Sequence, residues 1–300
     1  MNKVVERLDL IMKEFVISTE TNADLPVEFI KENQICVIPH YYTIEEEVYG
    51  DGKELTVKEF YDEMRNKKKA ATMASNPAVI KEKFTEYVKQ GKDILHISFS
   101  SALSGGYGNV VMVANEIMEE YPDIQIKVID TLSASLGETL MIMKALEMQQ
   151  LGVGIEAAAA AVEELIPHIC IQFTVDDLNH LYRGGRLSMA SAVLGTIINV
   201  KPILYIDTEG KLVALDKTRG RKKSLAMMVD NMEARIGSYR DKQIVIGVMH
   251  GDCEQDAEYV KDLIAERFGF DCFLIRPIGP SIGAHSGPGT VGIVFLGDYR

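Results

Sequence analysis

A pattern of short apolar run, polar turn and helix occurs three times in the first half of the chain. The three runs and the turns that follow them are 14–18 with 19–24, 94–98 with 99–107, and 126–129 with 130–137. Strands that alternate with helices pair in parallel, because each helix returns the chain to the same edge of the sheet. The sequence therefore predicts an α/β fold with a parallel sheet in this half.

Four serines lie at the end of the middle run and in the turn that follows it. Ser98, Ser100, Ser101 and Ser104 follow one another closely. Ligands of open parallel sheets bind at the carboxyl ends of strands, where helix N-termini offer free N–H groups. Serines also cap helices without any ligand, but four are more than capping requires. We expect an anion or carboxylate pocket at this turn.

The second half has a different order of elements, which predicts a second domain. A strand-like run occupies 168–173, and a β-hairpin is expected over 203–215. A chain of 300 residues is long enough for two cores. We expect residues 1–165 to form an α/β domain that carries the serine-rich loop. Residues 166–300 should form a smaller α+β domain, whose final segment packs back onto the first.

Four segments have a predicted local structure. Short helices are expected at the N-terminus and over 191–199, and a loop over 71–77. Residues 278–289 contain four glycines and two prolines, which predicts a glycine-enabled turn and neither a helix nor a strand. A histidine in a loop is often a solvated surface residue. The small residues around His285, however, let backbone and ligand approach closely, so we expect this segment to present His285 to a ligand.

Two basic groups need an explanation. Arg183 and Arg186 flank two glycines, and a cation in the last turn of a helix is favourable by itself, which accounts for Arg183. Arg186 lies past the turn and has no such reason to be there. Residues 219–223 open a helix, where cations oppose the helix dipole. We expect this cluster to face an anion or an acidic partner surface.

Composition and motifs exclude several classes. The net charge of −12 argues against nucleic-acid binding. The four cysteines are widely separated and show neither a disulfide framework nor metal-ligand spacing. No phosphate-binding loop, dinucleotide fingerprint or nucleophile elbow occurs. No stretch approaches the roughly 20 apolar residues of a membrane span, and the first residues lack the apolar core of a signal peptide. We expect a cytoplasmic protein without a cofactor or metal.

Five groups of residues stand in a fixed order along the chain. They are TETNADLP at 19–26, SSALSGGY at 100–107, VIDT at 128–131 with Ser135 and Gly137, RGGRLS at 183–188, and IGP at 278–280 with GAHSGPG at 283–289. In this order they resemble the DegV family of bacterial fatty-acid-binding proteins, over about residues 14–297. The resemblance implies an α/β domain joined to a smaller α+β domain with a long-chain fatty acid between them. It also implies that the protein carries the acid for a fatty acid kinase, which phosphorylates the carboxylate from ATP.

The resemblance also implies a set of site residues. The ligand-binding residues would be Ser75, Ser100, Ser101, Ser104, Gly105, Arg183, Arg186, Gly283, Ala284 and His285. Arg219 and Arg221 would face the kinase subunit. The implied partners are the fatty acid and the kinase, with no nucleic acid, and transient contact with a membrane stays open.

Three positions depart from the family pattern. The family's TSQPS loop reads ASNPA at 74–78, so the hydroxyl expected against the carboxylate is missing at Ala74, and Ser75 with backbone N–H groups would compensate. The family's SGTY reads SGGY, with Gly106 in place of the threonine. The DST of the first loop reads ETN at 20–22.

Two other classes of function stay open. A small-molecule phosphotransferase or hydrolase would use a loop serine, Ser101 or Ser104, with His285 as its base, although no acid is evident that would orient the histidine. A sensor or interaction module would bind its partner even with an empty cavity.

Overall fold

The structure of the protein is a computed structural model that describes residues 13–187 and 200–300. The short helices expected at the N-terminus and over 191–199 lie outside these described residues.

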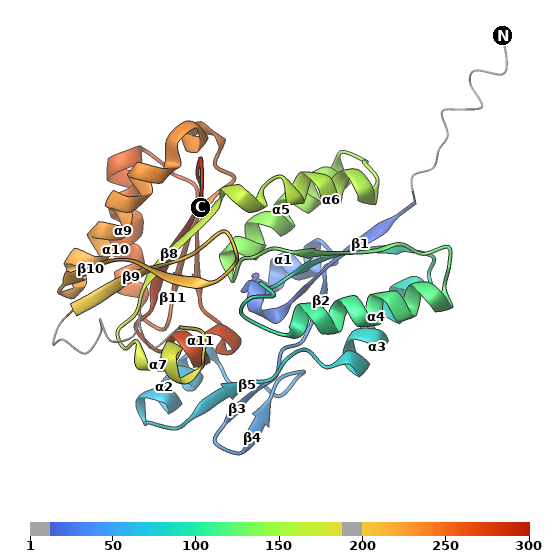
Figure 1. Cartoon of the computed structure of the whole chain (residues 1–300), viewed down its shortest axis with the longest axis horizontal. Coiled ribbons are helices and arrows are strands. Elements are labelled where there is room, and N and C mark those ends of the chain that lie inside the picture. The colour runs from blue at the N-terminus through green and yellow to red at the C-terminus, as the bar shows by residue number, and fades with distance from the viewer. Residues whose placement is uncertain (1–12, 188–199) are drawn as a thin grey trace, which may run out of the picture.

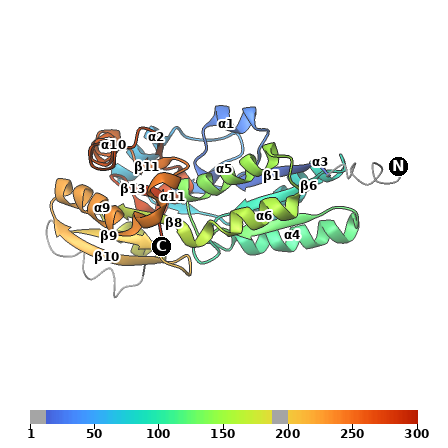
Figure 2. The ribbon, with the colours of Figure 1, turned by 90° about the horizontal axis from the view of Figure 1, so that it is seen from above.

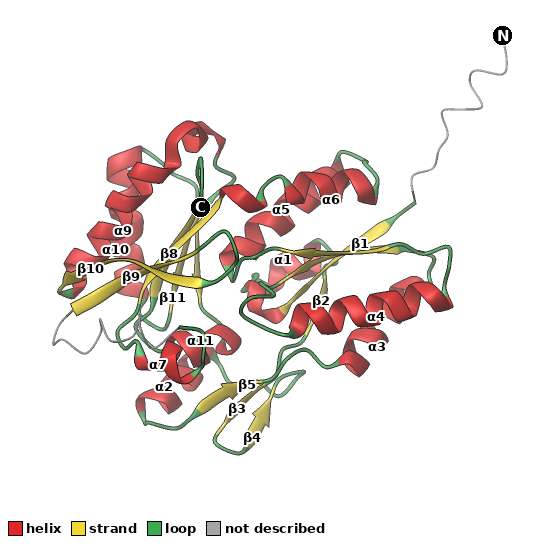
Figure 3. Ribbon diagram, viewed as in Figure 1, coloured by secondary structure: helices red, strands yellow, loops and turns green. Residues whose placement is uncertain are grey.

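Three sheets organise the described chain (Figure 1, Figure 3). The first has the order β2 (Cys36–Ile38), β1 (Phe15–Glu20), β6 (Asp93–Ser98), β7 (Ile126–Asp130). The second has the order β10 (Leu212–Arg219), β9 (Val200–Ile206), β8 (Ile169–Thr174), β13 (Val291–Leu296), β11 (Ile246–His250), β12 (Phe273–Pro277). The third has the order β4 (Glu47–Tyr49), β3 (Tyr42–Ile44), β5 (Ala70–Thr72).

Helices connect and cover these sheets. In the first half they are η2 (Thr21–Ala23), α1 (Val27–Glu32), α2 (Val57–Arg65), α3 (Pro77–Val88), α4 (Gly106–Glu120), α5 (Leu136–Gln150) and α6 (Ile155–Glu163). In the second half they are η3 (Ile166–His168), α7 (Asn179–Arg183), α9 (Arg221–Ile236), η5 (Gly237–Lys242), α10 (Glu254–Phe268) and α11 (Pro280–Ser286). No helix in the described ranges has the length and apolar character needed to cross a bilayer.

The first sheet is parallel and carries helices on both faces. Val16 packs with α3 and α4 on one face, whereas Phe15 and Ile17 pack with α5 and α6 on the other. Alternate residues of a strand point to opposite faces, so a strand covered on both sides must be apolar throughout. The predicted α/β fold with a parallel sheet is confirmed. The second half contains a mixed sheet, in which β11 and β12 pair in parallel and the other pairs are antiparallel.

Helix α5 lies between the two larger sheets (Figure 2). It contacts β1 and β6 of the first sheet and β8, β11 and β13 of the second. Leu136, Leu140, Met141 and Ile142 are buried around its circumference, as a helix enclosed on several sides requires. Helix α5 thus joins the two halves of the chain through its contacts with both sheets. The division of the chain into two domains at residue 165 remains our proposal.

The prediction for the glycine-rich segment 278–289 was wrong in part, because Pro280–Ser286 form the helix α11. Pro280 occupies the first turn, where a missing N–H costs nothing. Gly287, with φ +80°, ends the helix. Gly283 is needed inside the helix because the Tyr61 hydroxyl approaches so closely that a Cβ would collide with it. Helix α11 thus packs on α2 and β5 of the first half.

Candidate functional site

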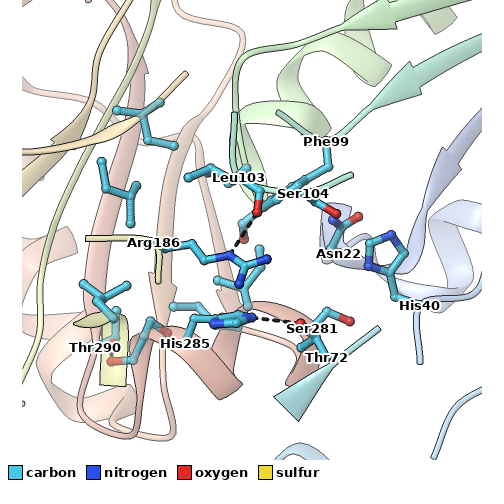
Figure 4. A pocket seen from close by; sticks show the side chains of 18 of the residues that line it. Asn22, His40, Thr72, Phe99, Leu103, Ser104, Arg186, Ser281, His285 and Thr290 are labelled. Atoms are coloured by element: carbon cyan, nitrogen blue, oxygen red, sulfur yellow. Dashed lines mark hydrogen bonds between the residues drawn. The ribbon is translucent and has the colours of Figure 1, made fainter. Parts of the chain in front are cut away.

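A cavity of about 140 Å³ lies between the two halves (Figure 4). The turns after β1, β6 and β7 border it on one side, at the carboxyl ends of those parallel strands. Strands β8 and β9 and helix α11 border it on the other. This is the edge at which parallel sheets bind their ligands.

Most of the cavity wall is apolar. Ile171 and Phe173 are two residues apart on β8, so both side chains point to the same face of the sheet. The apolar lining residues are Met73, Ala74, Phe99, Leu103, Ala134, Ile171, Phe173, Leu181, Ile206, Leu212, Met249, Ile278 and Ile282. A ligand in this cavity would therefore bury mainly apolar groups.

His285 projects from α11 into the cavity. Its Nε2 lies 2.8 Å from Oγ1 of Thr72 (Figure 4). Its Nδ1 is buried, has no hydrogen-bond partner in the described chain, and faces Gly184, where a Cβ would collide with it. Burial, assisted by the charge of Arg186, lowers the pKa of His285 to about 4. The imidazole is therefore neutral at neutral pH.

Arg186 reaches across the cavity toward the first half. Its Nε donates to the carbonyl of Leu103 over 3.0 Å, and its Nη1 donates to the carbonyl of Gly184 over 2.5 Å. These two bonds fix the guanidinium plane, and Figure 4 shows the group directed between Leu103 and His285. Arg186 thus brings a positive charge and N–H donors to the polar part of the wall.

Asn22 and His40 form a second polar edge of the cavity, away from Thr290 in Figure 4. Asn22 is 2% exposed, and its Oδ1 has no hydrogen-bond partner among the residues that the structure describes. The His40 Nε2 lies 2.8 Å from the Ser75 hydroxyl. Burial lowers the pKa of His40.

Glu20 supports this edge from behind. Its carboxylate accepts hydrogen bonds from the Ser98 hydroxyl and the Phe99 backbone N–H. Burial by itself raises the pKa of Glu20, but the imidazoles of His96 and His40 and the Phe99 N–H outweigh it, so the pKa lies below its ordinary value. An ionised, buried carboxylate at the end of β1 therefore fixes the two loops that border the cavity.

Four of the predicted ligand-binding residues line the cavity. These are Ser104, Gly105, Arg186 and His285. The Ser104 hydroxyl accepts a hydrogen bond from the Gly106 N–H. Gly105 is exposed at the mouth. Binding by each of them remains a prediction.

The other predicted ligand-binding residues stand behind or beside the cavity wall. Ser75 is buried against His40, and the Ser100 hydroxyl donates to the carbonyl of Gly210. Ser101 and Arg183 are exposed. Gly283 and Ala284 are buried in α11 next to Phe60 and Tyr61. Their link to a ligand is indirect in this geometry.

The two predicted partner-facing arginines differ in their surroundings. Arg219 is exposed at the end of β10. Arg221 is paired within the chain: its Nε lies 2.9 Å from Asp256, and its Nη1 lies 3.6 Å from Asp176. The anion that the basic cluster was expected to face is therefore, for Arg221, supplied by the protein itself.

Several lining residues were not predicted, among them Asn22, His40, Thr72, Ser135 and Ser281. Thr72 lies in the three-residue strand β5, which is too short to give a period-2 pattern, and the segment 71–77 was expected to be a loop. Asn22 belongs to a motif that the resemblance did identify, as a departure from the family pattern. The change from DST in the family to ETN at 20–22 was therefore the sequence signal that could have indicated Asn22.

The sequence of the chain is similar to those of proteins from one family. Residues 14–298 match the family described as "Uncharacterised protein, DegV family". A DegV domain-containing protein of Clostridium perfringens is 41% identical over 291 residues, which cover 96% of this chain and 99% of that protein. A DegV domain-containing protein of Streptococcus pyogenes is 33% identical over 285 residues, which cover 94% and 98%.

Solved structures share the fold over nearly the whole chain. A DegV family protein from Thermus thermophilus, described by its fatty acid binding, is 26% identical with a TM-score of 0.84, covering 95% of this chain and 99% of that one. DegV from Bacillus subtilis, described as a fatty acid binding protein, is 26% identical with a TM-score of 0.82, covering 95% and 100%.

Proposed function

The chain belongs to the DegV family, and we propose that it binds a long-chain fatty acid in the cavity between its two larger sheets. The observation that carries the proposal is the make-up of that cavity. Its wall is mainly apolar, and its polar groups gather near His285 and at the edge formed by Asn22 and His40. Binding sites for small molecules are typically lined by apolar side chains, with a few polar groups that fix the orientation of the ligand. Solved relatives described as fatty-acid binding support it.

The carboxylate would lie against the donors near His285. A carboxylate only accepts hydrogen bonds, so it needs N–H or O–H groups around it. Arg186 supplies a charged donor, and Thr72 and Ser104 supply hydroxyls. Charge-assisted hydrogen bonds of this kind are the stronger ones. These groups fix the orientation of the acid.

The tail would supply most of the affinity. At about 0.8 kcal/mol per buried methylene, a chain of roughly 16 carbons gains on the order of 12 kcal/mol before ordering costs. A cavity of about 140 Å³ holds on the order of ten water-sized groups. Binding a longer tail therefore requires lining side chains to rotate, and Met249 is flexible enough to do so.

We extend the proposal to presentation of the carboxylate to a kinase subunit, with the protein as a carrier without chemistry of its own. The donors lie close to an open mouth, since Gly105 is exposed and Met73, 41% exposed, lines the same cavity. A bound carboxylate there stays reachable from outside. The exposed Arg219 offers a cation for an acidic surface of the kinase.

Mass spectrometry of lipid extracted from the freshly purified, denatured protein tests the binding. We expect about one equivalent of long-chain acid, and delipidated protein should take up palmitate or oleate in calorimetric titrations. A folded protein that carries no acid and refuses both would overturn the proposal.

Presentation is tested separately. The loaded protein is incubated with ATP and a bacterial fatty acid kinase subunit, and acyl phosphate is trapped with hydroxylamine. Tight binding without any hydroxamate would leave the proposed fatty-acid binding intact and remove presentation to the kinase from the proposal.

The hydrolase or phosphotransferase alternative has less support in this geometry. The hydroxyl that contacts His285 belongs to Thr72, whereas Ser101 is exposed and the Ser104 hydroxyl accepts from Gly106. Turnover of ester or phosphate substrates that disappears in Ser101→Ala or Ser104→Ala would revive it.

A further inference from the structure

Thr72 of the first half and His285 of the second half contact each other in the wall of the cavity. Thr72 is the last residue of β5, and His285 lies in α11. The 2.8 Å contact joins Oγ1 to Nε2, and both side chains line the cavity. In Figure 4 the pair stands below the Arg186 guanidinium.

The surroundings of the ring decide which nitrogen carries the hydrogen. Nδ1 is buried against Gly184 without a partner in the described chain. Buried N–H groups without an acceptor are rare in native structures because they lose their hydrogen bond to water. The ring is neutral near pH 7, because burial and the Arg186 charge lower the pKa of His285 to about 4. Its single hydrogen therefore belongs on Nε2, where it points at Thr72.

This tautomer fixes the direction of the Thr72 hydroxyl. A hydroxyl has one hydrogen to donate and two lone pairs that accept. If Nε2–H donates to Oγ1, the hydroxyl hydrogen must point away from the ring. The described residues offer Oγ1 no second partner. The free hydrogen is thus available on the cavity side of the pair.

We propose that Thr72 donates this hydrogen to the carboxylate of the bound fatty acid, while His285 acts behind it as a positioning residue. The inference rests on the proposed function and assigns the contact with the acid to a side chain that the sequence did not identify. Ala74 also lines the cavity, but it has no hydroxyl that could donate this hydrogen bond. Thr72 would therefore contribute to selection of an ionised head group over a neutral one, because a hydrogen bond to a charged acceptor is the stronger of the two.

The test compares an ionised ligand with a neutral one of the same length. Affinities for palmitate and hexadecanol are measured by displacement of a fluorescent fatty acid from delipidated wild type, Thr72→Val and Thr72→Ser. We expect Thr72→Val to lower the affinity for palmitate roughly tenfold or more and to change that for hexadecanol much less. Thr72→Ser keeps the hydroxyl and should bind palmitate nearly as well as the wild type.

Two controls separate this role from a structural one. Thr43→Val makes the same change on the neighbouring strand β3, where Thr43 pairs with Ala71 and lies outside the cavity lining, and it should bind both ligands as the wild type does. Nitrogen NMR of the ligand-free protein reads the tautomer directly. We expect His285 to carry its hydrogen on Nε2.

Each result that contradicts the proposed role of Thr72 points to a different part of the proposal. Equal losses for palmitate and hexadecanol in Thr72→Val, or no loss for either, would remove Thr72 from the head-group contact while the proposed function stands. A hydrogen on Nδ1 would overturn the assigned direction of the hydroxyl. A wild type that binds no fatty acid would overturn the proposed function and this role with it.

Discussion

The carboxylate of Asp24 accepts a hydrogen bond from the backbone N–H of Gly279 over 2.9 Å, which ties the turn after β1 to the start of α11. The same carboxylate accepts from the Ser135 hydroxyl, and the Asp24 carbonyl accepts from Arg276 Nε. Burial raises the pKa of Asp24 to about 7, against the lowering effects of Ser135, Gly279 and Arg276. One buried carboxyl thus joins three segments that border the cavity.

Replacing Asp24 with asparagine should remove a pH-dependent part of the stability. The folded protein keeps a proton on Asp24 up to about pH 7, whereas the unfolded chain releases it near the ordinary pKa of 3.8. The contribution of this group to the free energy of unfolding is therefore fully present below about pH 4 and is lost as the pH rises through 7. We expect the wild type to lose stability relative to Asp24→Asn over this range, by up to about 4 kcal/mol. Urea unfolding between about pH 4 and 8 measures it.

The exposed Asp271 provides the control for this experiment. Asp271→Asn should follow the wild-type stability at every pH. Parallel curves for the wild type and Asp24→Asn would contradict a raised pKa at Asp24.

Adding a methyl group at Gly184 should displace His285. Gly184 has an ordinary φ of −73°, so alanine is not strained by the backbone, but its Cβ would collide with His285 Nδ1. We expect Gly184→Ala to lower palmitate affinity roughly tenfold, since a lost hydrogen bond to a charged group is of that size. Gly108→Ala in α4, where a Cβ meets open space, should bind normally. An unchanged affinity in Gly184→Ala would show that the position of His285 does not matter for binding.

Local sequence patterns predicted most elements of the fold because their signals are contained within one element. Thr56 with Glu59 predicts the start of α2, and the structure has the complete capping box there. The helix α11 was missed for the opposite reason. Its glycine content reflects the approach of Tyr61 from another part of the chain, and a local reading takes such a glycine as a turn signal.

The candidate site was predictable where its residues lie in motifs and not where they meet only in three dimensions. Arg186 and His285 stand out because glycines surround them in the sequence. Thr72 has no such neighbours, and its importance comes from a contact with a residue 213 positions away. The separation of Ser100 from the cavity could not be predicted either, because Gly210 of the second half takes its hydroxyl.

Filling the cavity at Leu212 should shorten the acids that fit. Leu212 is half-buried and lines the wall at the start of β10, so a larger side chain that points into the cavity would occupy space that the tail needs. We expect Leu212→Trp to bind a 16-carbon acid at least roughly tenfold more weakly, since several methylenes at about 0.8 kcal/mol each lose their place, while a 10-carbon acid is affected less. Lys217→Trp, exposed on the same strand, is the matched control. Equal losses for both acids would place the tail elsewhere.

Reversing the charge of Arg219 should weaken presentation to the kinase without weakening acid binding. Arg219 is exposed and lies at the end of β10, whereas the charge of Arg221 is already paired with Asp256 and Asp176. Charges at the rim of an interface act mainly on the rate of association, because they steer the two proteins toward each other. Salt screens this attraction, so its range becomes shorter as the ionic strength rises. We expect Arg219→Glu to lower the rate of acyl-phosphate formation several-fold at low salt, with a smaller loss at high salt and an unchanged palmitate affinity. Lys217→Glu makes the same charge change two residues away, so a loss equal to that of Arg219→Glu would indicate that net charge, and not a contact at Arg219, governs the encounter.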